Sequence, residues 1–197
     1  MREDFSDLLA AAQEGDDAAF TTLFRSVQPV LLRYLRTIGG RLADDVAAET
    51  WVSVVRGLGR FRGDEDGFRA WVFTIARARL VDARRTAART PVPVDVTAEL
   101  AEVPGGADVP AAVDELMSTE AALALIGRLP PDQAEAVLLR HVVGLDPTQA
   151  AEVLGKRPGA VRIATMRGLA RLRTLLPPPA PVEQSAPGCN ATDRANG

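Results

Sequence analysis

The feature that most constrains the fold is a segment that divides the chain into two halves. Residues 91–120 contain seven acidic residues and no basic one, together with four prolines and a glycine pair. This composition is typical of a linker that cannot bury enough apolar surface to fold by itself. In both flanking halves the apolar residues recur at helical spacing, without the alternating pattern of a strand. The sequence therefore predicts an all-α protein in which a flexible acidic linker joins two small helical domains.

We expect four segments along the 197 residues. Residues 1–90 form an N-terminal helical domain, 91–118 the linker, 119–176 a C-terminal helical domain and 177–197 a disordered tail. The single cysteine, Cys189, lies in the tail and can form no internal disulfide, which favours a reducing compartment. Apolar runs are too short to span a bilayer, and the first residues are acidic, unlike those of a signal peptide. We expect a cytoplasmic protein without membrane insertion.

Several helices separated by short breaks are expected in the N-terminal domain. Apolar spacing predicts helices over residues 30–38, 44–58 and 68–85, with an interruption at Pro29. The stretch GRFRGDEDG, residues 59–67, is typical of a loop. The helix after this loop carries closely spaced arginines and is a candidate surface for an anionic partner.

The C-terminal domain has the pattern of a helix-turn-helix. Asp146, Pro147 and Gln149 form the capping-box start of a short helix. Gly155 stands where a left-handed turn residue is needed, and a second helix is expected to begin near Pro158. Two helices joined by such a turn are typical of a DNA-binding unit.

Charge distinguishes the second helix of this motif. The stretch GKRPGAVRIATMRGLARLR, residues 155–173, has six basic residues and no acidic one, although the whole chain has a net charge of −3. A solvated amphipathic helix is the alternative, but such a face usually mixes the two signs. We expect Arg162 and Arg167 to contact base edges in the major groove, with other basic residues at phosphates. The predicted DNA contacts are Lys156, Arg157, Arg162, Ile163, Met166, Arg167 and Arg171.

Three stretches in order carry a resemblance to a known family. They are DDVAAETWVSVVRGLGRFRGD, FRAWVFTIARARLVDARR and LPPDQAEAVLLRHVVGLDPTQAAEVLGKRPGAVR. With the acidic linker between the last two, the chain resembles bacterial RNA polymerase sigma factors of the sigma-70 family, extracytoplasmic-function (ECF) group. The resemblance implies a protein that is not an enzyme, has no cofactor or metal, and directs promoter-specific initiation by core RNA polymerase.

The same resemblance implies partners and roles for individual residues. The partners are core RNA polymerase, through its largest-subunit clamp coiled coil and its flap, promoter DNA and, in many relatives, an anti-sigma factor. The residues implied to bind the clamp are Asp45, Glu49, Val52 and Arg56. The loop between Phe61 and Gly67 would hold a flipped base of the −10 element, and the helix after it would grip the opened strand. The residues implied in −10 recognition and melting are Phe61, Arg62, Trp71, Arg77, Arg84 and Arg85.

The chain departs from the family pattern at two places. Ile163 and Ala164 stand where relatives commonly have serine and then arginine, which suggests a different −35 sequence with apolar contact to a thymine methyl. Ala78 stands where relatives often have asparagine, which leaves the flipped base open.

Linker length bears on how both domains could engage one promoter. About thirty flexible residues span roughly 30 Å, whereas promoter sites two helical turns apart lie roughly 70 Å from each other. A stretched chain of this length reaches about 100 Å, so the polymerase would have to hold it extended. We therefore expect the free protein to bind promoters poorly.

Two other functions deserve comparison with this one. A dimeric helix-turn-helix repressor or activator would explain the C-terminal domain but not the basic RARLVDARR stretch or the acidic linker. An enzyme could use Asp44, Asp45 and Glu49 as metal ligands, but the chain has one histidine and no second acidic motif to complete a site.

Overall fold

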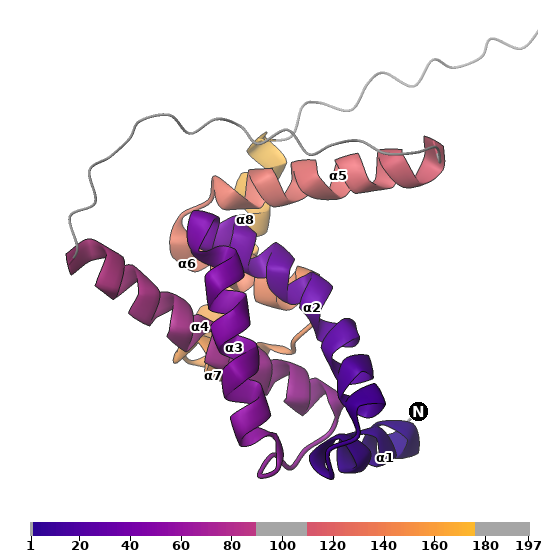
Figure 1. Ribbon diagram of the computed structural model, residues 1–197. Coiled ribbons are helices and arrows are strands. Elements are labelled where there is room, and N and C mark those ends of the chain that lie inside the picture. The colour runs from indigo at the N-terminus through magenta and orange to yellow at the C-terminus, as the bar shows by residue number, and fades with distance from the viewer. Residues whose placement is uncertain (1, 90–109, 176–197) are drawn as a thin grey trace, which may run out of the picture.

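The computed structural model describes residues 2–89 and 110–175. Within these two ranges the regular structure is entirely helical, as the sequence predicts (Figure 1). The predicted tail and most of the predicted linker lie outside the described residues.

Four long helices form the N-terminal unit, with a 3₁₀ turn, η1, between the second and the third. The elements are α1 (Arg2–Gln13), α2 (Asp17–Gly39), η1 (Gly40–Leu42), α3 (Ala43–Leu58) and α4 (Glu65–Arg89). Their common core contains Leu31, Tyr34 and Phe73, all fully buried. The ring of Tyr34 on α2 meets the edge of Phe73 on α4 at 5.2 Å between centroids, which ties these two helices together.

Helix α2 corrects one expectation from the sequence. Pro29 does not interrupt it, and the helix continues through this position to Gly39. Proline removes one helical hydrogen bond, but Pro29 is exposed, so water can satisfy the carbonyl left without a donor. Buried Val27 and Leu31 on either side hold the helix against the core, and the expected break was therefore wrong.

Four further helices form the C-terminal unit. The elements are α5 (Pro110–Gly127), α6 (Pro131–Val137), the π-helical turn η2 (Leu138–Val142), α7 (Pro147–Leu154) and α8 (Pro158–Leu175). Helix α5 begins inside the segment expected to be linker. The π-helical turn was not expected, and the Val143 N–H donates to the Leu138 carbonyl five residues earlier.

The helix-turn-helix has the expected local geometry. The Asp146 side chain accepts hydrogen bonds from the N–H groups of Thr148 and Gln149, and the Gln149 side chain accepts one from the Asp146 N–H. Gly155 is left-handed, with φ 62° and ψ 35°, and α8 begins at Pro158.

The two units pack directly against each other. Helix α7 lies along α4, and α5 and η2 lie against α2 (Figure 1). Buried apolar residues of both units form one continuous core. The sequence suggested two units held apart by a linker and did not indicate this contact.

Candidate nucleic-acid and polymerase interfaces

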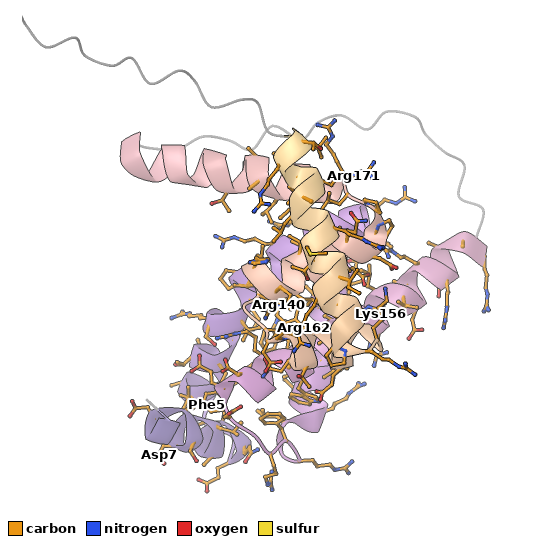
Figure 2. All side chains as sticks on the ribbon, turned by 180° about the vertical axis from the view of Figure 1, so that it is seen from behind. Phe5, Asp7, Arg140, Lys156, Arg162 and Arg171 are labelled. Carbon is orange, nitrogen blue, oxygen red and sulfur yellow. The ribbon has the colours of Figure 1, made fainter. Side chains whose placement is uncertain are left out.

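Helix α8 presents its basic side to solvent. Arg162, Arg167 and Arg171 are exposed, and Figure 2 shows Arg162 near the beginning of α8 and Arg171 near its end. Two large apolar side chains lie among them, with Ile163 48% and Met166 63% exposed. This face combines cationic and apolar side chains, the types that contact phosphates and thymine methyls in known major-groove complexes.

The basic residues at the beginning of α8 differ in their pairing. Lys156 is half-buried, and its Nζ lies 2.9 Å from Asp132 Oδ1 of α6. Arg157 is exposed, and within the described residues it makes no ion pair, as is also true of Arg162 and Arg167. Lys156 is therefore already partly neutralised, whereas the three arginines are free to meet an external anion.

The inner side of α8 sets its distance from the rest of the unit. Val161 is fully buried, and Gly168 lies against α6, where a Cβ would stand 2.7 Å from Val137 Cγ2. Hydrogen bonds from the N–H groups of Gln149 and Thr148 lower the pKa of Asp146, so this cap of α7 stays ionised. Local capping and close packing therefore orient α8.

Helix α3 presents a second surface, mixed in character. The four residues expected to bind polymerase, Asp45, Glu49, Val52 and Arg56, are all exposed on it. Val55, three residues after Val52, is 56% exposed and was missed in the sequence, although its helical spacing from Val52 could have revealed it. Val52 and Val55 are therefore neighbouring exposed apolar side chains among the charges of α3.

Behind this surface lies an aromatic cluster. Trp51 is buried, and its indole N–H donates to Gln28 Oε1 at 2.6 Å. Its ring packs 4.7 Å from Phe24. The cluster packs α3 against α2.

The loop after α3 is built around Phe61. Its ring stacks on Trp71 at 5.0 Å and meets the edge of Phe68 at 5.5 Å. Gln13 of α1 donates to the carbonyls of Leu58 and Phe61 at 2.8 and 3.0 Å. Phe61 is therefore half-buried and held from two sides.

Arg62, which follows Phe61 in this loop, is exposed. Its guanidinium donates to the Gly59 and Phe61 carbonyls at 3.1 and 2.6 Å. These hydrogen bonds hold the Arg62 guanidinium at the loop, one residue after the ring that stacks on Trp71.

The arginines in the middle and at the end of α4 differ in their partners. Arg77 is half-buried, and its Nε donates to Glu135 Oε2 of α6 at 3.1 Å. Arg84 donates to the Ile38 carbonyl, and exposed Arg85 lies 3.8 Å from Asp82. Arg79, which was not singled out in the sequence, donates to Ser53 Oγ and joins α4 to α3.

The described residues hold no group of three or more His, Cys, Asp or Glu side chains arranged for a metal ion. Asp44, one of the carboxylates of the enzyme alternative, lies 3.2 Å from the guanidinium of Arg36. In the same ranges no helix is both long and apolar enough to cross a membrane.

Comparison with known proteins assigns each of the two helical units to a protein family. The family described as "Sigma-70 region 2" matches residues 23–90, and "Sigma-70, region 4" matches residues 119–172. The ECF RNA polymerase sigma factor ShbA of Streptomyces griseus is 37% identical over 190 residues, which cover 89% of this chain and 98% of that protein. This chain belongs to the ECF sigma factors. It is therefore a sigma-70 family initiation factor and not an enzyme.

Other similar proteins support the same family membership. SigM of Mycobacterium tuberculosis is 34% identical over 173 residues, covering 87% of this chain and 84% of that protein. The solved structure of CnrH in complex with the cytosolic domain of CnrY matches with a TM-score of 0.59 and 26% identity, covering 87% of this chain and 96% of CnrH. The sigma factor acts with core RNA polymerase in promoter-specific initiation, which excludes the repressor and enzyme alternatives.

Proposed function

We propose that this sigma factor divides promoter recognition between two surfaces, α8 for the −35 element and α4 with its preceding loop for the −10 element. The observation that carries the proposal is the exposed basic side of α8, where the part of the chain from Pro158 to Leu175 has no acidic residue. A helix of this charge that follows a tight turn fits the major groove.

In region 4, Arg162 and Arg167 contact base edges, while Ile163 and Met166 contact thymine methyls. Arg157 and Arg171 contact phosphates, and Lys156 joins them after leaving Asp132. Such a division separates contacts that choose the sequence from contacts that position the helix.

In region 2, the loop containing Phe61 and Arg62 receives an unstacked base of the −10 element next to Trp71. The opened strand then follows α4 along three arginines. These strand contacts are Arg77, Arg84 and Arg85.

For the polymerase, we propose that α3 binds the clamp coiled coil of the largest subunit. The contact consists of Asp45, Glu49, Val52 and Arg56, and exposed Val55 extends it. Region 4 meets the flap, and residues 91–118 connect the two domains in the complex. Because polymerase and chromosome share one compartment, the site of action is the cytoplasm.

An anti-sigma factor is a further partner in this proposal. The support is the similarity to CnrH, whose solved structure contains the cytosolic domain of CnrY.

Run-off transcription with core polymerase on genomic fragments of the host tests the proposal. We expect start-site-specific RNA with the wild-type chain, and a loss of roughly five- to 150-fold for Arg162→Ala or Arg167→Ala, because a good base contact contributes about 1–3 kcal/mol. Arg128→Ala, at an exposed position outside α8, is the matched control. Absence of any specific transcript, or normal activity of both α8 variants, would contradict the proposed promoter recognition.

A further inference from the structure

We propose that Gln13 of α1 is a positioning residue for −10 recognition, because its side-chain amide holds the beginning of the loop that receives the unstacked base. This inference rests on the proposed role of that loop. Helix α1 lies outside the residues that the sigma-70 region 2 family matches, which begin at residue 23. The family match by itself therefore assigns no role to α1.

The contact between Gln13 and the loop consists of two hydrogen bonds. Gln13 is half-buried at the end of α1, and its Nε2 donates to the Leu58 carbonyl at 2.8 Å and to the Phe61 carbonyl at 3.0 Å. A side-chain amide nitrogen carries two hydrogens, and both are used here. Because carbonyl oxygens only accept, the nitrogen end of the amide has to face the loop. A side chain that cannot donate therefore loses both bonds.

The end of α3 needs a donor from outside the helix. The last carbonyls of a helix have no partner within it, and many helices supply one by ending on a left-handed glycine. Gly59 follows the last residue of α3 but has φ −60° and ψ −18°, which is right-handed. The Leu58 carbonyl accepts from the Phe61 N–H at 3.0 Å and from Gln13. Gln13 thus completes the C-terminal cap of α3 at the residue where the loop begins.

Helix α1 also supports the aromatic side of the loop. The ring of Phe5, which is buried, lies 6.0 Å from that of Phe68, and Phe68 in turn lies 5.5 Å from Phe61. A Cβ built on Gly63 would stand 2.9 Å from Phe61 Cζ, so the loop backbone passes close against this ring. The loop therefore rests on α1 through a polar contact and through a series of packed rings.

The two ends of the loop are held in different ways. At the far end, Asp64 Oδ1 accepts from the Gly67 N–H at 2.9 Å, and the Asp64 carbonyl accepts from the Phe68 N–H at 2.8 Å. These bonds join close neighbours in sequence and form the start of α4. At the near end, the bonds to Gln13 join residues 45 and 48 positions apart. The near end is therefore the one whose position depends on another helix.

The Phe61 carbonyl links Gln13 to the exposed part of the loop. It accepts from Gln13 at 3.0 Å and from the Arg62 guanidinium at 2.6 Å, so the two side chains meet at one oxygen atom. Loss of the Gln13 donor leaves that oxygen to Arg62 alone and lets the loop shift against the Phe61 and Trp71 rings. Discrimination between bases depends on where the contacting groups stand, so a shifted loop accepts a wrong base more readily.

The first experiment measures base preference at the −10 element. Run-off transcription with core polymerase and the full chain compares a mapped promoter with versions in which each −10 base is replaced in turn. We expect Gln13→Met and Gln13→Glu, which keep the length of the side chain but cannot donate, to lower the preference for the native base at one −10 position by roughly fivefold or more. Gln13→Lys, which can donate, should retain more of this preference. Glu14→Gln, at the exposed neighbouring position, is the matched control and should keep the wild-type preference.

The second experiment observes the loop without DNA. The chain has two tryptophans, and in a Trp51→Phe background the emission reports on Trp71, which stacks on Phe61. We expect Gln13→Met to shift this emission to longer wavelength, because a loosened loop exposes the indole to water, while Glu14→Gln leaves the emission unchanged. Thermal unfolding of the same variants measures any loss of stability.

The outcomes separate this inference from the proposed function. An unchanged −10 preference in both Gln13→Met and Gln13→Glu, or an unchanged Trp71 emission in Gln13→Met, overturns the positioning role. An equal fall on every promoter version together with a lower melting temperature also overturns it, because that pattern indicates a loss of stability alone. The function proposed for the loop stands in each case if Phe61→Ala changes the −10 preference. If Phe61→Ala leaves the preference unchanged as well, the loop has no part in base choice and its proposed function fails.

Discussion

Gly168 of α8 lies so close to Val137 of α6 that an added Cβ would stand 2.7 Å from Val137 Cγ2. The same Cβ would stand 3.4 Å from the Gln133 carbonyl oxygen, which belongs to the backbone and cannot turn away. This glycine therefore sets how closely the DNA-facing helix approaches the rest of region 4.

Gly168→Ala should destabilise region 4. Alanine favours a helix over glycine by about 1 kcal/mol, but the backbone oxygen of Gln133 cannot move away, so we expect overpacking to cost about 2–3 kcal/mol and the net loss to be about 1–2 kcal/mol. Thermal unfolding measures it. Gly159→Ala on the same helix is the control, because a Cβ there has no atom within 4 Å and should be neutral or stabilising. Equal effects of the two variants would contradict the packing argument.

Phe61→Ala should impair promoter melting more than −35 binding. The change removes the ring that stacks on Trp71 at 5.0 Å, and we expect the loop to lose about 1–3 kcal/mol of stability. Permanganate reactivity of promoter thymines in the polymerase complex measures the opened strand. Phe61→Leu keeps an apolar side chain at this position and should retain more strand opening than Phe61→Ala. Wild-type melting by Phe61→Ala would show that the aromatic cluster has no part in this step.

Val52→Glu and Val55→Glu should weaken binding to core polymerase at least tenfold without lowering stability. Both side chains are about half exposed, so an acidic replacement costs the fold little, whereas burying that charge against the clamp is costly. Fluorescence anisotropy of the labelled sigma factor titrated with core enzyme measures the affinity. The control is Ala10→Glu, at an exposed position of α1. Undiminished affinity of both variants would remove α3 from the polymerase contact.

Tyr34→Phe should change the response to alkaline pH. Burial, and secondarily the charge of Glu135, raise the pKa of Tyr34 above its ordinary value of 10.0. Because the folded-state pKa lies above the unfolded-state value, this stabilisation is complete below pH 10 and is lost as the pH rises further, by about 1.4 kcal/mol per pH unit. The phenylalanine variant lacks this loss.

Thermal unfolding of wild type and Tyr34→Phe between pH 7 and 11 measures the difference. At pH 7 the variant should be neutral or stabilised by about 1 kcal/mol, because within the described residues the Tyr34 hydroxyl has no hydrogen-bond partner. Lys156→Gln controls for titration of the single lysine. Parallel alkaline slopes for wild type and Tyr34→Phe would contradict the assignment.

The local features of region 4 could be predicted from sequence because neighbours in the chain determine them. The capping box of Asp146 and Gln149, the left-handed Gly155 and the start at Pro158 each depend on residues a few positions apart. The exposed face of α8 follows from helical periodicity in the same way. Composition likewise predicted two helical regions joined by a linker.

Only the tertiary structure decided the features that join distant parts of the chain. Pro29 remains inside a helix because the core on both sides holds α2 in place, and Glu135 is buried because Arg77, on the other region, neutralises it. Helical periodicity indicates which side of each helix is apolar, but not which other helix will cover it. That choice depends on the packing of all helices together, and here it placed region 4 on α4.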